Sequence, residues 1–179
     1  MENNQRMHGS YKRFFAMIGT AMIAMFFLMY LNSYAILGHA WFSETRLIMT
    51  LIMAGAMMII MLAFMLGMYA SKKTNMAIFV GAGLLLLSSV WLVRSQITVD
   101  GVDYMEGMIP HHSIAILTST RARIDDPRVR NLADEIIRAQ RIEIKEMEWL
   151  IADIKANGPS TSRAEGYARA VPEFSSVPE

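Results

Sequence analysis

Three long uncharged stretches in the first half of the chain limit what it can fold into. They cover about residues 14–36, 47–69 and 76–93. The hydrocarbon core of a bilayer is about 30 Å thick, and a helix needs roughly 20 apolar residues to cross it. Lipid offers the backbone no hydrogen bonds, so such segments form helices. Aromatic residues lie near the span ends, as is typical of membrane interfaces: Tyr30, Tyr34, Trp41 and Trp91. The sequence therefore predicts three membrane-spanning helices.

Basic residues near these spans indicate their orientation. Five lie before the first span or in the second loop, and two lie on the opposite side: Arg6, Lys12, Arg13, Lys72 and Lys73, against Arg46 and Arg94. Short cytoplasmic loops carry the excess of Lys and Arg. We therefore expect a multi-pass protein of the bacterial inner (cytoplasmic) membrane. Residues 1–13 would be cytoplasmic, and the carboxyl-terminal domain would be periplasmic or extracellular.

The first span also has features of a cleaved signal peptide. Gly38-His39-Ala40 loosely resembles a cleavage site. The apolar segment before it is longer than the 7–15 residues of a typical signal peptide. We interpret the span as an anchor.

Composition and motifs exclude several classes of function. The net charge is +1, so there is no electrostatic argument for a nucleic-acid partner. The chain has no cysteine, which excludes disulfides and thiolate metal sites. It also has no nucleophile–base motif, phosphate-binding loop or cofactor motif. We therefore expect a protein that is not an enzyme and whose first partner is membrane lipid.

The polar second half predicts a small external domain of two helices over residues 95–157. Asp126 and Pro127 are typical of a helix N-cap and first helical position, so the second helix begins there. Gly158 and Pro159 end it. The two helices would form an antiparallel hairpin about residues 125–127. We expect the remaining tail, residues 158–179, to be disordered because it is rich in Ser, Pro and charged residues.

Side chains suited to binding a metal recur on one face of each helix of this hairpin. The faces carry Met105, Met108 and His112 on the first helix, and Gln140, Glu143 and Met147 on the second. In the hairpin, His112 would lie level with Gln140, Met105 with Met147, and Met108 with Glu143. His111 lies beside this face, and Asp103 precedes it. Pro110 would kink the first helix or mark its start.

The chemistry of these residues favours copper. Thioethers are soft ligands that select Cu(I), whereas imidazole also accepts zinc, which stays possible. A di-iron site would require Glu-x-x-His pairs, and the chain has none. The alternative is that the methionines only pack the seam between the helices.

The stretch Tyr104-Met105-Glu106-Gly107-Met108-Ile109-Pro110-His111-His112-Ser113-Ile114-Ala115-Ile116 resembles the hallmark of the domain of unknown function 305 (DUF305) family. Ala139 to Ile144 and Met147 to Leu150 resemble its second signature. The resemblance covers about residues 100–155. It implies a ferritin-like helical fold, export, and copper binding by Met105, Met108, His111, His112 and Met147. Many members carry two helix pairs, and this chain has one. We therefore expect a homodimer or higher oligomer that completes a four-helix bundle, with a metal site that could span subunits.

Methionines also recur in the membrane. In the second span they occupy every fourth position: Met49, Met53, Met57, Met61 and Met65. The third span has only Met76, at its edge. A thioether path for Cu(I) would explain this asymmetry, and so would packing by flexible side chains. Ala63 and Gly67 form a small-xxx-small pair that would permit close helix approach. His39, in the first external loop, could be the first ligand for an incoming ion.

Three functions are compatible with these patterns. The leading interpretation is a membrane-anchored protein that sequesters copper or hands it to other copper-handling proteins outside the cytoplasm. The second is a component of a Cu(I) transport path through the methionine-lined spans. The third is a structural or interaction module that binds no metal.

Overall fold

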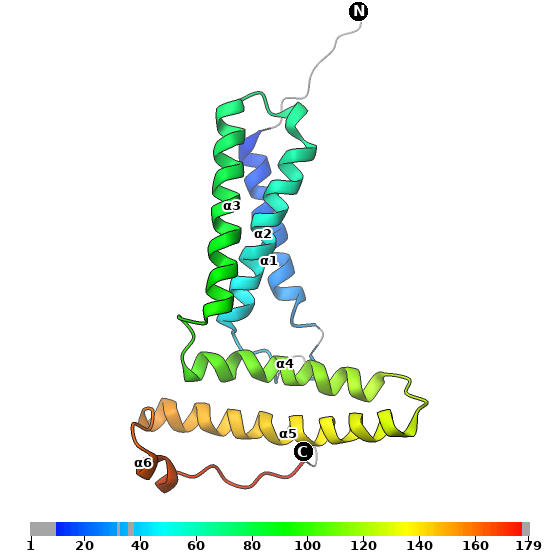
Figure 1. Ribbon diagram of the computed structural model, residues 1–179, viewed down its shortest axis with the longest axis vertical. Helices are drawn as coiled ribbons and strands as arrows, with labels where there is room; N and C mark the ends of the chain where they lie inside the picture. Colours follow the sequence, from blue (N-terminus) through cyan, green and yellow to red (C-terminus); the bar gives the residue numbers. More distant parts are fainter. Residues whose placement is uncertain (1–9, 32, 36–37, 177–179) are drawn as a thin grey trace, which may run out of the picture. The chain divides into compact units, whose positions relative to one another are not determined.

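The computed structural model describes residues 10–31, 33–35 and 38–176, and the elements in these ranges are all helices. They are α1 (Tyr11–Leu28), α2 (Glu44–Phe64), the 3₁₀ helix η1 (Leu66–Met68), α3 (Lys72–Ser95), α4 (Gly101–Arg121), α5 (Pro127–Asn157) and α6 (Arg163–Ala168) (Figure 1). This confirms the all-α fold. Helices α1, α2 and α3 are long and apolar enough to cross a membrane, as predicted.

The first of these helices is shorter than predicted. It ends at Leu28, whereas the apolar window runs to residue 36. Residues 32, 36 and 37 lie outside the described residues. A side chain from the next helix closes α1, because Arg46 Nη1 donates a hydrogen bond to the carbonyl oxygen of Met29 at 3.1 Å. A cation at a helix C-terminus is also favoured by the helix dipole. Apolar composition alone therefore overestimated the length of this helix.

Close approach of α2 and α3 occurs at Gly55. A Cβ atom placed on this glycine would lie 2.9 Å from Leu86 Cβ and 3.0 Å from the Ala82 carbonyl oxygen, so only glycine fits. The predicted small pair, Ala63 and Gly67, makes no close helix contact within the described chain, because both residues are exposed. Helix α2 ends at Phe64, so Gly67 no longer continues the face that carries Ala63.

The same unit has an apolar cluster formed by α1, α2, α3 and Tyr69. Its buried members are Phe14, Ile18, Leu62, Tyr69 and Ile78. A buried amide is satisfied beside it: Tyr11 Oη donates to Asn75 Oδ1 at 2.8 Å, and Asn75 Nδ2 donates to the Tyr69 carbonyl oxygen at 3.1 Å. Buried polar groups are stable in such surroundings only when they are paired in this way.

The second unit contains the predicted antiparallel hairpin. Helices α4 and α5 lie side by side along most of their length (Figure 1). Asp100 caps α4 by accepting hydrogen bonds from the backbone N–H groups of Val102 and Asp103, at 2.8 and 2.9 Å. Asp126 caps α5 and Pro127 is its first residue, as the sequence predicts. Gly158 follows its last residue at φ +79°, a conformation that glycine adopts without strain.

The loop between α1 and α2 belongs to this unit, which comprises Tyr30–Glu44 and Val99–Glu179. Trp41 packs against the apolar cluster of the hairpin. The loop approaches α4 closely at Gly107, because a Cβ atom there would lie 3.2 Å from Ser43 Oγ and would require a shift of a few tenths of an ångström. Two helices alone bury little apolar surface. The loop covers part of the apolar surface that the two helices alone would leave exposed.

The carboxyl-terminal tail has more structure than predicted. It contains α6, and Arg169 after that helix pairs with Asp153 of α5 at 2.9 Å. Lys145 Nζ donates to the Ser175 carbonyl oxygen at 3.2 Å, so the tail runs back along α5 on the side away from α4 (Figure 1). The polar composition of the tail does not predict these specific hydrogen bonds.

Candidate metal centre

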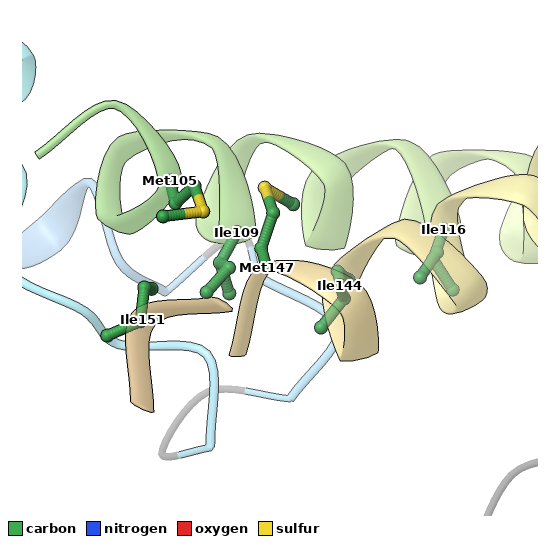
Figure 2. Packing of buried hydrophobic residues seen from close by; sticks show 6 residues of the cluster. All are labelled: Met105, Ile109, Ile116, Ile144, Met147 and Ile151. Atoms are coloured by element: carbon green, nitrogen blue, oxygen red, sulfur yellow. The ribbon is translucent and has the colours of Figure 1, made fainter. Parts of the chain in front are cut away.

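The seam between α4 and α5 consists of buried isoleucine and methionine side chains. Six buried residues form its cluster: Met105, Ile109, Ile116, Ile144, Met147 and Ile151 (Figure 2). Met108 packs against the cluster and is only half-buried. Helical spacing explains this face, because residues three or four apart lie on the same side of a helix. The structure thus brings the three predicted methionines of the hairpin to one seam.

Helix α4 runs through Pro110 without a break, so this proline does not mark the start of the helix. Pro110 has no N–H to donate to the carbonyl four residues earlier. Its ring is fully buried instead. The predicted side-chain stripe therefore stays on one continuous helix.

Two titratable side chains, His112 and Glu143, meet at the centre of the described seam. His112 Nδ1 lies 3.1 Å from Glu143 Oε2, and the exposed fractions of the two side chains are 13% and 46%. The prediction placed His112 level with Gln140, so the observed register differs by three residues, or about one turn. Five residues, 122–126, separate the two helices. His112 lies near Glu143 and, by the same register, Met108 lies level with Met147.

Two buried polar atoms in this seam have no hydrogen-bond partner among the described residues. They are His112 Nδ1, whose approach to Glu143 lacks hydrogen-bond geometry, and Gln140 Oε1. Such atoms are costly when left unpaired in an apolar seam. Both are donor atoms of the kind that bind metal ions or water. The donor set of the seam thus fits a metal ion.

The pKa of His112 is lowered from its ordinary 6.5 by burial. The carboxylate of Glu143 opposes this effect and the neighbouring His111 adds to it. The imidazole is therefore neutral at pH 7. Neutral imidazole is the form that binds metal ions.

Two other predicted ligands have different positions. His111 is exposed, with its ring centroid 6.1 Å from that of His112. Asp103 belongs to the helix cap, where its Oδ2 accepts from the Asp100 N–H at 3.4 Å. In the part of the chain that the structure describes, no three His, Asp or Glu side chains converge on one point. A metal site here depends on thioethers.

His39 contacts the opposite flank of α4. Its Nδ1 lies 2.8 Å from Ser113 Oγ, and the same oxygen accepts a hydrogen bond from the Tyr34 N–H at 2.8 Å. Ser113 and Met108 are five residues apart, so they point about 140° apart around the helix. His39 therefore does not share the flank on which Met108 lies. Burial lowers the pKa of His39.

A second contact fixes the same loop. Lys155 Nζ pairs with Glu106 Oε1 at 2.7 Å and lies 5.6 Å from the centre of the Trp41 ring. Sequence reasoning missed this group and Ser113. No local pattern identifies them, because each partner comes from a different segment of the chain.

The methionines of α2 do not form one stripe with a single environment. Met57, Met61 and Met65 pack against the apolar cluster around Leu62, whereas Met49 and Met53 are exposed. Steps of four residues turn about 40° beyond a full circle, so the row moves around the helix. Met22 of α1 packs against the same cluster.

Comparison with known proteins identifies the family of the unit that contains the hairpin. Residues 101–174, which include both helices of the hairpin and α6, match the family model described as Domain of unknown function (DUF305). The chain is also 35% identical over 109 residues to the uncharacterized protein L153 of Acanthamoeba polyphaga mimivirus, a match covering 60% of this chain and 70% of that protein. No solved structure matches the chain. Through its hairpin and the tail that follows, the chain belongs to the DUF305 family.

Proposed function

We propose that the chain is a membrane-anchored protein whose α4–α5 hairpin binds copper, as Cu(I), and sequesters it or hands it over outside the cytoplasm. One observation carries the proposal. The seam brings together three methionines and a neutral histidine, and its His112 Nδ1 and Gln140 Oε1 are buried without hydrogen-bond partners. Thioether and imidazole donors together select Cu(I) over hard cations. Met105, Met108, Met147 and His112 would hold the ion, and Glu143 lies beside His112 at 3.1 Å.

The connectivity supports an external position for the hairpin. The loop of residues 30–44 and the hairpin belong to one unit, which supports a topology with both on the same side of the membrane. Three crossings by α1, α2 and α3 would give that topology. The basic residues before α1 and between α2 and α3 favour the cytoplasm for the other side.

A transport path through the membrane has less support. The methionines of α2 that are partly buried pack against Leu62 and its neighbours, which accounts for them as packing residues. Met49 and Met53 are exposed and do not continue that row. The spans serve as an anchor in our proposal.

Titration of the purified full-length chain with Cu(I), in detergent and against a chromophoric Cu(I) chelator, tests this function. We expect Met108→Leu, Met147→Leu and His112→Ala each to weaken binding by ten-fold or more, on the order of 1.4 kcal/mol per decade. The matched control is Met76→Leu, an exposed methionine of α3. Equal affinity for the wild type and all three seam variants would refute the proposal. Zn²⁺ in place of Cu(I) should bind more weakly.

A further inference from the structure

We propose that two copies of the hairpin pack antiparallel through the flank that carries Met108 and His111, so that both copies complete one metal centre. The metal part of this inference rests on the proposed function. The association itself does not. Four observations lead to it: an uncovered flank, its exposed residues, the charges at the two ends of the hairpin, and the position of its midpoint.

The hairpin has one covered flank and one open flank. The loop of residues 30–44 covers the first through Ser113, and Trp41 and Lys155 lie there too. The tail occupies the outer side of α5, where Lys145 binds Ser175. The opposite flank carries Met108 and His111, about 140° and 160° around α4 from Ser113. Among the described residues, the hydrogen bonds of the loop and the tail to the hairpin involve neither of these two side chains.

Exposed apolar and aromatic residues continue along this open flank. Tyr104 on α4 is 57% exposed and Leu132 on α5 is 56% exposed. Between them lie Ala115 and Ala139, whose small side chains permit close helix approach. Helix α4 alone is about 31 Å long at 1.5 Å per residue, and two helices are about 20 Å wide. The face therefore covers roughly 600 Å², and two such faces reach the lower end of stable protein interfaces.

The distribution of charged residues along the hairpin indicates that a second copy of the chain packs on the open flank in antiparallel orientation. The half of the hairpin near the turn, residues 113–141, has six arginines and four carboxylates. The other half, residues 100–112 and 142–157, has seven carboxylates and two lysines. Two hairpins packed in parallel would place like-charged ends together. Antiparallel packing places the basic end of each on the acidic end of the other, which is electrostatically complementary.

The midpoint of the hairpin coincides with the candidate site. Helix α4 runs from Gly101 to Arg121, so His111 is its central residue. His112 pairs with Glu143 at the same height. In a two-fold dimer both chains use the same surface patch, so the axis passes through the middle of that patch. In the antiparallel dimer the axis therefore lies at the level of His111 and His112. The two His111 side chains, exposed in the separate hairpins, then meet at this axis and add imidazole to the one shared centre.

Single-cysteine crosslinking tests the geometry, because the natural chain has no cysteine. In the full-length chain in detergent, with metals removed, His111→Cys should form a disulfide-linked dimer under mild oxidation. Ala152→Cys is the control, since this exposed residue lies on α5 far from the axis. A crosslink at position 152 but not at 111, or at neither position, would overturn the proposed dimer.

Charge at the turn end provides a second test of orientation. Leu132→Glu and Leu132→Lys remove the same exposed side chain. In the antiparallel dimer this position meets the acidic end of the other copy, so Leu132→Glu should weaken association on the order of ten-fold more than Leu132→Lys. Equal association of the two variants would contradict antiparallel packing.

Copper stoichiometry separates the shared site from the proposed function. The wild type should bind one Cu(I) per two chains, and monomeric Leu132→Glu should lose affinity. A monomer that binds one Cu(I) per chain with unchanged affinity would overturn the shared site and leave the proposed function intact. A crosslinked dimer that binds no Cu(I) would refute the proposed function and leave the association standing.

Discussion

Replacing Ser113 by alanine should release the loop of residues 30–44 from α4. Ser113 is fully buried, and its Oγ lies 2.8 Å from both the Tyr34 N–H nitrogen and His39 Nδ1. The variant removes the hydroxyl that Tyr34 and His39 both contact, but it leaves the helix unchanged. A partly buried N–H that loses its acceptor costs about 1–2 kcal/mol. The population of the open loop should therefore rise roughly 5- to 30-fold.

Hydrogen exchange of the full-length chain in detergent, followed by mass spectrometry, measures that population. Peptides covering residues 33–43 should exchange faster by the same factor in Ser113→Ala, while peptides from α3 remain unchanged. Ser119→Ala is the matched control, because Ser119 lies on the same helix and the described structure shows no hydrogen bond from its side chain. Unchanged exchange of the loop in Ser113→Ala would refute the reasoning that these two contacts hold it.

Three further predictions concern packing and pH. Ile109→Ala, at a fully buried position, should lower the free energy of unfolding of the hairpin by about 2–5 kcal/mol in denaturant titrations. Burial lowers the pKa of His39 and His112 below the 6.5 of an unfolded chain. The unfolded chain then binds more protons, so the free energy of unfolding should decrease as the pH falls below about 6.5; thermal melts at pH 7.5 and 5.5 that coincide would contradict this. Gly55→Leu should lower the melting temperature of the membrane helices, whereas Gly81→Leu, with nothing within 4 Å of its Cβ position, should not.

Some features of the fold follow from local patterns. Length and apolar composition predicted three spans, and Asp126 with Pro127 predicted the start of α5. These predictions succeed because lipid and helix caps act on neighbouring residues. The end of α1 was not predicted, because it depends on Arg46, which comes from the following helix.

The candidate site was predicted in composition but not in register. Helical periodicity identified the Met and His faces of α4 and α5. In the structure His112 lies beside Glu143, three residues from the predicted Gln140. The role of Asp103 as a cap residue and of His39 as a loop contact depends on partners elsewhere in the chain. Periodicity contains no information about such partners.

The loop of residues 30–44 makes the compact unit that contains the DUF305 match discontinuous in sequence. Trp41 is synthesised about sixty residues before Gly101, and α2 and α3, which are long and apolar enough to span a membrane, lie between them in the sequence. The loop is therefore made before the hairpin that it packs against, and this packing can form only after α2 and α3 have been synthesised. A soluble fragment that begins after α3 would lack Trp41 and expose the apolar surface that this side chain covers.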